Sequence, residues 1–270
     1  MPNSFSDLDR PALRGRDLER SLLREPGLWT SLRVVESVGS TNAEVAALAR
    51  GGAAAGTVLV AEEQTAGRGR LDRVWAAPAR SGLTFSVLLR PVGVGAASWG
   101  WFPLLAGVAV AEAVAALAEL DVRLKWPNDV LVGDRKLAGI LAERVDDAVV
   151  LGVGLNVSLR AGELPVPTAT SLLLEESAVV DRSPVLLAVL RSIGKRYDEL
   201  VRASGDPEVS GLRSAYLTLC STVGRSVRVE LPGGRVVAGT AVDVDTSGRL
   251  VVQTPDGTEP IGAGDVVHVH

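Results

Sequence analysis

The stretch from Gln64 to Trp75 gathers three arginines and two glycines in one short polar segment, as Gly67-Arg68-Gly69-Arg70 followed by Arg73. Glycine lets the backbone approach a ligand closely, and successive N–H groups can then hold an anion. Arginine adds forked donors that suit phosphate or carboxylate groups. The segment therefore predicts an anion-binding loop, with a solvated basic turn as the simpler alternative.

A second candidate is Lys125-Trp126-Pro127-Asn128-Asp129, in which a lysine and an aspartate flank a turn stiffened by proline. A lysine at a strand end can neutralise a carboxylate or a phosphate as a point charge. An aspartate nearby can hold Mg²⁺, which usually takes one or two carboxylates together with substrate phosphates. The alternative is a structural ion pair between Lys125 and Asp129 across the turn.

Two further motifs follow, Lys136-Leu137-Ala138-Gly139-Ile140-Leu141-Ala142-Glu143 and Gly152-Val153-Gly154-Leu155-Asn156. On a regular strand, Lys136 shares one face with Ala138 and Ile140. A lysine among small apolar neighbours is costly to bury without an anion. The alternatives are a lysine that protects a strand edge from aggregation and glycines that serve only packing.

The composition excludes several other kinds of chemistry. Of the 28 basic residues among 270, 25 are arginine, and histidine occurs only at positions 268 and 270. With one cysteine, Cys220, the chain cannot form an internal disulfide, and neither a zinc finger nor a catalytic triad with a central histidine fits. A net charge of -4 does not favour broad electrostatic binding to nucleic acid. Catalysis must therefore use arginine, lysine, carboxylates, amides and bound ions.

The elements that would position these residues interleave strands and helices. Runs of β-branched and apolar residues predict buried strands, Ser40 to Asn42 offers an N-cap for a helix, and the alanine-rich stretch 99–120 predicts a buried helix. The hairpin around Gly133-Asp134 favours a mixed or antiparallel sheet in an α+β domain. We expect strands at 31–38, 57–63, 83–89, 122–126, 130–132, 136–143 and 148–157, and helices within 11–24 and at 40–50, 99–120 and 184–202.

After Cys220 the pattern changes to short strands separated by glycine-containing turns, which predicts a small all-β barrel. The expected strands are 225–231, 235–244, 250–254, 258–261 and 266–269. The predicted organisation is an N-terminal extension, a catalytic domain and a C-terminal domain over residues 1–29, 30–219 and 220–270. Residues 1–24 lack the apolar stretch of a signal peptide, so we expect a cytoplasmic protein.

The four motifs, in this order and spacing, resemble those of biotin protein ligases, and Ser40-Thr41-Asn42 and Gln64 match as well. The flanking segments look most like the actinobacterial, monofunctional type that lacks a DNA-binding domain. The resemblance covers residues 30–270 and implies an α+β fold, with a catalytic domain like that of class II synthetases, a mixed central sheet and a C-terminal SH3-like β-barrel.

The resemblance also implies an activity. Such an enzyme is an ATP-dependent biotin–[biotin carboxyl carrier protein] ligase that forms biotinyl-5′-AMP and then transfers biotin to a lysine of a carboxyl carrier domain of acyl-CoA carboxylases. Its small molecules would be biotin, ATP and Mg²⁺. The expected partners include no nucleic acid and no membrane, and the expected state is a monomer or a weak, ligand-induced homodimer.

The resemblance assigns roles to individual residues. Lys136 would bond the biotin carboxyl oxygen, Arg70 would clamp the anions and shield the adenylate, and Asp129 would lie near Mg²⁺ or the incoming lysine. Trp75 would stack on adenine. The residues implied for biotin are Ser40, Thr41, Asn42, Gln64, Gly67, Arg68, Lys136 and Gly139. Those implied for the nucleotide are Arg68, Arg70, Arg73, Trp75, Lys125, Asn128 and Asn156, with Asp129 for the metal.

One position departs from the family pattern. The loop of the family reads Gly-Arg-Gly-Arg-x-Gly, whereas Asp72 stands at its last position here. Aspartate tolerates a left-handed turn, but its carboxylate partly offsets the charge of Arg70 and Arg73. We therefore predict looser retention of the adenylate than in an Asp72→Gly variant, and equal rates of adenylate release would refute this.

Three alternatives compete with this interpretation. A lipoate ligase or octanoyl transferase shares the fold, although Lys125-Trp126-Pro127-Asn128-Asp129 and the arginine-glycine loop favour biotin. A biotin-responsive repressor would need an N-terminal winged-helix domain, which the extension 1–29 is too short to form. A biotin acceptor typically presents a lysine between methionines, and Met1 is the only methionine.

Overall fold

The computed structural model describes residues 9–71 and 73–269, so the departure at Asp72 lies outside the described residues. Seven strands form one mixed sheet in the order β1-β2-β3-β7-β6-β5-β4, with β1 and β2 parallel and the other neighbours antiparallel. Each strand lies within two residues of its expected range. The strands are β1 (Ser31–Val38), β2 (Thr57–Gln64), β3 (Gly82–Leu89), β4 (Val122–Lys125), β5 (Asp129–Val132), β6 (Arg135–Val145) and β7 (Ala148–Asn156).

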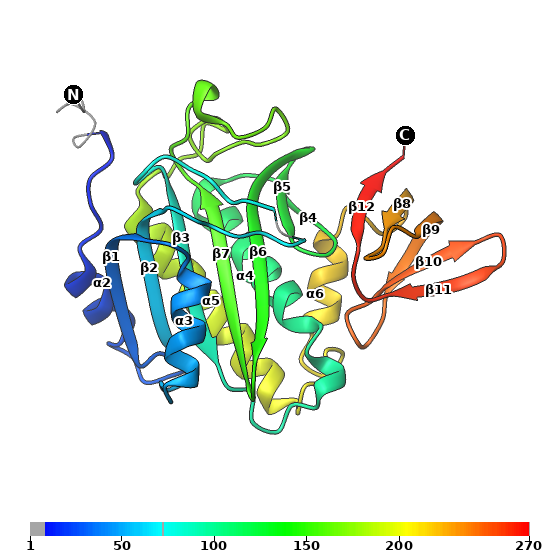
Figure 1. The fold of residues 1–270 in the computed structure, drawn as a ribbon, viewed down its shortest axis with the longest axis horizontal. Coiled ribbons are helices and arrows are strands. Elements are labelled where there is room, and N and C mark those ends of the chain that lie inside the picture. The colour runs from blue at the N-terminus through cyan, green and yellow to red at the C-terminus, as the bar shows by residue number, and fades with distance from the viewer. Residues whose placement is uncertain (1–8, 72, 270) are drawn as a thin grey trace.

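Helices cover the two faces of this sheet unequally (Figure 1). One face carries α3 (Thr41–Arg50), which packs a small apolar cluster against β2, β3 and β7. The other face carries α4 (Trp101–Ala118) and α5 (Arg182–Arg202) over the larger core. Among the described residues α4 alone is long and apolar enough to cross a membrane, and 72% of it is buried inside the protein. It is therefore a core helix, as expected from its composition.

Two shorter α-helices also pack on the domain built around this sheet. The helix expected within 11–24 is α2 (Gly15–Leu22), which buries Leu18 and Leu22 and packs against β1 and α5. Helix α6 (Leu212–Leu219) packs against α4 and β4 and was not expected from the sequence. Its side chains Leu212 and Tyr216 are buried, so α6 owes its place to tertiary packing more than to a pattern of its own.

The N-terminus of α3 is capped from a neighbouring strand. Ser40 is the N-cap residue, as expected, but its side chain makes no capping hydrogen bond. Instead the side-chain oxygen of Gln64, at the end of β2, accepts hydrogen bonds from the Thr41 backbone N–H (2.7 Å) and the Thr41 hydroxyl (3.0 Å). This arrangement fixes the start of α3 against the strand that leads into the arginine-glycine loop.

The expected face of Lys136 is wrong because β6 contains a bulge. Opposite β5, Val130 pairs with Ala138 and Leu131 with Lys136, which leaves Leu137 as an extra residue. Lys136 therefore lies beside Gly139, where an added Cβ would be 3.3 Å from Lys136 Nζ, whereas Ile140 packs toward α4. The bulge turns the ammonium group onto the face of the sheet that carries α3.

The C-terminal region forms a five-stranded antiparallel sheet in the order β11-β10-β9-β8-β12, consistent with the expected SH3-like domain. The domain built on the seven-stranded sheet contacts the β9–β10 turn of this region, since the indole N–H groups of Trp101 and Trp126 donate to the carbonyls of Thr246 and Gly248 (2.9 and 3.1 Å). The strands are β8 (Ser226–Glu230), β9 (Val236–Val244), β10 (Leu250–Thr254), β11 (Gly257–Ile261) and β12 (Asp265–His268).

Candidate active site

The Asp129 carboxylate lies among several cations where β4 ends and β5 begins. Asp129 stands opposite Lys125 in the strand register, yet its close partner is Lys136, with Nζ 2.5 Å from Oδ1. An ion pair between Lys125 and Asp129 was the alternative considered for this turn. In the structure the residue paired with Asp129 is Lys136. Burial lowers the pKa of Lys125, and Asp129 partly offsets this effect. Burial likewise lowers the pKa of Arg70, and the charge of Asp129 partly offsets this shift. With three cations around one carboxylate, the centre suits anionic ligands.

Trp75 lies over the sheet next to this centre. Gly139 of β6 and Gly154 of β7 are opposite each other, and Cβ atoms added to them would lie 3.1 and 2.3 Å from the indole ring. The two glycines thus leave a slot that admits a flat ring. Lys136 Nζ lies 5.9 Å from the ring centroid, within cation–π range. The motif that contains Lys136 and the motif that contains Gly154 therefore both contribute to the contact with Trp75.

A buried chain of polar side chains runs beneath the first turn of α3. Ser86 Oγ on β3 lies 2.8 Å from the Thr41 hydroxyl and 2.5 Å from Asn42 Oδ1. Asn42 Nδ2 donates to the carbonyl of Leu141 and to Glu143 (3.2 and 2.7 Å). Both N–H bonds of the Asn42 side-chain amide are thus used inside the domain. Asn42 therefore has a structural role that was not predicted from the sequence.

The arginine-glycine loop folds back on itself as a small hairpin. Arg68 and Val74 form an antiparallel bridge, and Trp75 N–H donates to the Gly67 carbonyl at 3.0 Å. Two of its arginines have acidic partners, since Arg68 lies 3.6 Å from Glu143, and Arg73 pairs with Asp265 of the C-terminal sheet. Carboxylates outside the loop therefore balance its charge. Arg73 is thus paired with β12, while its charge also acts on Arg70 and Lys125.

The two motif asparagines hold the ends of the sheet strands. Asn128 Nδ2 donates to the Ile140 carbonyl at 2.9 Å, and the Ile140 N–H donates back to the Asn128 carbonyl at 3.0 Å. Asn156 is buried, and its Nδ2 donates to the Thr170 carbonyl at 2.9 Å. This hydrogen bond holds the segment after β7 beside the end of the strand that carries Asn156.

A cavity of about 500 Å³ opens beside the cation centre, between the N-terminus of α4, the Trp126-Pro127-Asn128 turn and the C-terminal sheet. Arg70 and Arg249 contribute charge to its wall, and Ile140 contributes apolar surface. Within residues 9–71 and 73–269 no group of three His, Cys, Asp or Glu side chains could hold a metal ion.

Sequence reasoning missed Ser86 and Glu143 as members of the site. Ser86 is a polar residue inside the apolar run of β3, and it is fully buried. Glu143 closes the Lys136 motif and contacts both Asn42 and Arg68. A buried polar residue on a strand beside a recognised motif was the signal that could have identified Ser86.

Comparison with known proteins gives a consistent result. Residues 34–158 match the biotin/lipoate A/B protein ligase family, and residues 222–269 match the biotin protein ligase C-terminal domain. A biotin--[acetyl-CoA-carboxylase] ligase of Mycobacterium tuberculosis is 46% identical over 96% of this chain and 97% of its own length. The bifunctional ligase/repressor BirA of Escherichia coli is 31% identical over 78% of this chain and 66% of its own length.

A solved structure agrees with these relatives. Biotin protein ligase from Aquifex aeolicus, in complex with biotin and ATP, superposes with a TM-score of 0.75 at 30% identity, over 89% of this chain and 99% of that one. The fold and the resemblance predicted from the sequence are confirmed. The chain belongs to the biotin protein ligase family.

Proposed function

We propose that this chain is an ATP-dependent ligase that activates biotin as biotinyl-5′-AMP and transfers it to a lysine of a biotin carboxyl carrier domain. The ligase relative and the neighbour solved with biotin and ATP support this proposal. Within the molecule, one observation carries it. Lys136 contacts Asp129, Lys125 stands opposite it in the strand register, and the charge of Asp129 acts on Arg70, all beside the slot that holds Trp75. Such a centre can bring two anions, a carboxylate and a triphosphate, into contact.

The chemistry proceeds in two balanced steps. A carboxylate oxygen of biotin bonds to the α-phosphorus of ATP, and the bond to pyrophosphate breaks. The amine of the carrier lysine then attacks the acyl carbon, loses a proton and displaces AMP. Lys136 and Arg70 stabilise the negative charge in both steps, provided that Lys136 exchanges Asp129 for the biotin carboxylate.

The roles of the individual residues are part of this proposal. Thr41 and Gln64 are joined to each other and offer polar atoms for the ureido ring, while Asn42 shapes the wall behind them. Trp75 supplies a flat surface for adenine. The remaining residues proposed for biotin are Ser40, Gly67, Arg68, Lys136 and Gly139. Those proposed for the nucleotide are Arg68, Arg70, Arg73, Lys125, Asn128 and Asn156.

Mg²⁺ would enter as the complex with ATP. Asp129 is the carboxylate at the centre, and among the described residues no group of three or more His, Cys, Asp or Glu side chains could hold the ion. That donor set fits Mg²⁺, which commonly binds through one or two carboxylates plus substrate phosphates. The ion would neutralise phosphate charge while Lys136 and Arg70 act on the carboxylate.

The partners follow from the same proposal. The acceptor is a carrier domain of an acyl-CoA carboxylase, and a cytoplasmic location stays a prediction. A ligand-induced homodimer is supported by β6, because its pairing with β5 ends at Gly139, so Leu141–Val145 lack a strand on that side within the described part of the chain. A second copy could add a strand there.

The proposal is tested by incubating the protein with labelled biotin, ATP, Mg²⁺ and a carboxylase carrier domain. We expect one label per carrier domain, and none when the acceptor lysine is replaced by arginine. Lipoate in place of biotin separates the alternative lipoate ligase. Transfer of lipoate without transfer of biotin would establish that alternative instead.

A further inference from the structure

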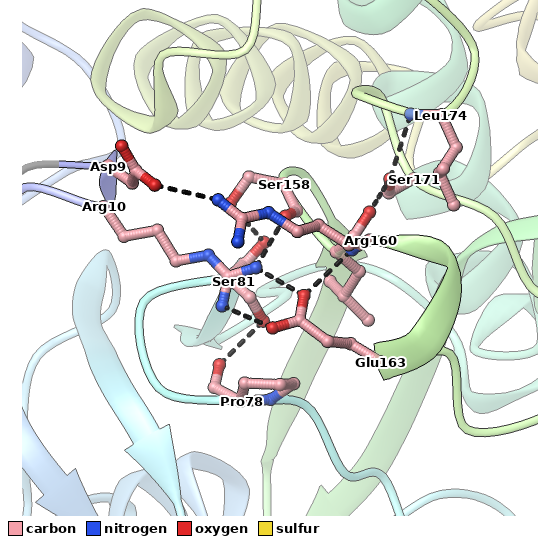
Figure 2. Close-up of polar contacts among 10 residues, drawn as sticks. Asp9, Arg10, Pro78, Ser81, Ser158, Arg160, Glu163, Ser171 and Leu174 are labelled. Carbon is pink, nitrogen blue, oxygen red and sulfur yellow. Dashed lines mark hydrogen bonds and ion pairs between the residues drawn. The ribbon is translucent and has the colours of Figure 1, made fainter. Parts of the chain in front are cut away.

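Residues 9–13, which we call the N-terminal strap, are fastened to the segment that follows β7 (Figure 2). The Arg10 guanidinium contacts both carboxylate oxygens of Glu163 (3.1 and 2.5 Å) and donates to the Ser158 carbonyl at 2.8 Å. Asp9 pairs with Arg160 at 2.8 Å. The Arg10 side chain is only 13% exposed, so this bidentate contact is shielded from solvent.

A second anchor ties the strap to the sheet. Glu62 on β2 and Arg182 at the start of α5 form a buried ion pair at 2.5 Å. Glu62 also accepts the Leu13 N–H at 2.6 Å, and Arg182 donates to the Pro11 carbonyl at 2.6 Å. The strap therefore has a fixed course along the domain, and Arg10 reaches Glu163 from a rigid base.

The segment held by Arg10 leads directly to the active site. Five residues after Glu163, the Thr168 carbonyl accepts the Lys136 N–H at 2.7 Å, and the Thr170 N–H donates to the Lys136 carbonyl at 2.9 Å. The Thr170 carbonyl also accepts Asn156 Nδ2. One short stretch thus fixes the backbone of Lys136 and the side chain of Asn156.

The part of the segment between these contacts has little support of its own. Residues 161–167 are exposed or half-buried, and Val166 is 49% exposed. Glu163 accepts the Arg160 N–H at 2.9 Å within its own turn, but that bond alone does not tie the turn to the domain. Arg10 supplies a tie from a distant part of the chain.

We propose that Arg10 is a positioning residue for the ligase reaction. Through Glu163 it holds residues 158–172 so that Lys136 and Asn156 keep the geometry required for the nucleotide and the reacting carboxylate. This inference rests on the proposed function for the parts played by Lys136 and Asn156. The contact between the strap and the segment stands independently of that function.

The experiment compares Arg10→Ala and Arg10→Lys with Arg16→Ala as a matched control. Arg16 is exposed on α2 and, among the described residues, makes no ion pair or side-chain hydrogen bond. Two quantities are measured for each full-length protein. One is amide hydrogen exchange at Lys136 and Thr170, whose N–H groups donate across the contact, and the other is the KM for ATP and for biotin in adenylate formation.

For Arg10→Ala we expect exchange at these amides to rise about tenfold and the KM for ATP to rise about three- to tenfold, with the KM for biotin changed less than about twofold. Arg10→Lys should lie between wild type and Arg10→Ala, because lysine keeps the charge but loses the bidentate geometry. Arg16→Ala should match the wild type. Adding Glu163→Gln to Arg10→Ala should cause little further change, since both act through one contact.

Several results would overturn the inference. Exchange at Lys136 and Thr170 equal in Arg10→Ala and Arg16→Ala would show that the strap does not hold the segment. Faster exchange spread equally over the C-terminal sheet would show a global loss of stability instead. Faster local exchange with unchanged KM for ATP would remove the positioning role. A wild-type protein that forms no adenylate refutes the proposed function, and the exchange data still decide whether the strap holds the segment.

Discussion

The buried ion pair between Glu62 and Arg182 offers a sharp test of how the N-terminal part of the chain is attached. Their side chains are 2% and 6% exposed, and they lie 2.5 Å apart. Replacing Glu62 by glutamine removes the negative charge but keeps a side chain of the same size. Arg182 would then remain buried with neutral acceptors alone, namely the glutamine amide oxygen and the carbonyls of Pro11 (2.6 Å) and Gly82 (3.4 Å).

The expected cost follows from this geometry. Removing one partner of a buried pair costs about 3–5 kcal/mol, because an uncompensated charge stays behind. This is a large share of a total stability of about 5–15 kcal/mol. For a chain of this size, each kcal/mol shifts Tm by about 2–4 °C, so we expect Glu62→Gln to lower Tm by about 10 °C.

The assay is thermal unfolding followed by circular dichroism, with Glu36→Gln as the control. Glu36 pairs with Arg80 at 2.8 Å but is 73% exposed, and surface pairs contribute below about 1 kcal/mol. Its Tm should therefore change by less than about 3 °C. A Glu62→Met/Arg182→Met protein should recover part of the loss, because no charge is left buried. Equal shifts for Glu62→Gln and Glu36→Gln would refute the reasoning.

Three further predictions concern other parts of the molecule. Gly154→Ala places a Cβ 2.3 Å from the Trp75 ring, so we expect the KM for ATP to rise at least about tenfold. The control Gly27→Ala adds a Cβ with nothing within 4 Å and should leave the KM for ATP unchanged. Equal KM values for the two variants would contradict the proposed slot. The Arg10 guanidinium holds the pKa of Glu163 below its usual value, so their contact stabilises the fold above about pH 4.3 and the gain is lost as pH falls through the lowered pKa. Thermal unfolding should show a Tm gap between wild type and Glu163→Gln that is constant from pH 5 to 7 and shrinks below about pH 4, and a gap independent of pH would count against the pair. Burial raises the pKa of the Cys220 thiol, so Ellman's reagent at pH 8 should label the native protein far more slowly than the guanidinium-unfolded protein, and equal rates would contradict this burial.

The strands and the large helices could be predicted because their signals are local. Runs such as Thr57–Gln64 are rich in β-branched residues and are bounded by turn residues, and α4 combines alanine with apolar residues on nearly every side. The face of Lys136 could not be predicted in this way. A bulge depends on the partner strand, and the assumption of strict alternation fails where Leu137 is inserted.

The site motifs were recognisable in the sequence, but the side-chain contacts between them and distant residues were not. The sequence contains 25 arginines, and nothing local shows that Arg10 meets Glu163 across 153 positions. The same holds for Gln64 as the cap of α3 and for the partner of Asp129. These contacts are set when distant segments pack together, so they become visible only in the folded structure.

The two-step reaction is tested most directly by isolating the activated intermediate. The protein is mixed with equimolar biotin and an excess of ATP and Mg²⁺, freed of small molecules by rapid gel filtration, and analysed by mass spectrometry for bound biotinyl-5′-AMP. A carboxylase carrier domain is then added without ATP. We predict one bound adenylate per active site and its transfer to the carrier lysine, with release of an equal amount of AMP. A protein that holds no biotinyl-5′-AMP, and labels the carrier only while ATP is present, would contradict the account.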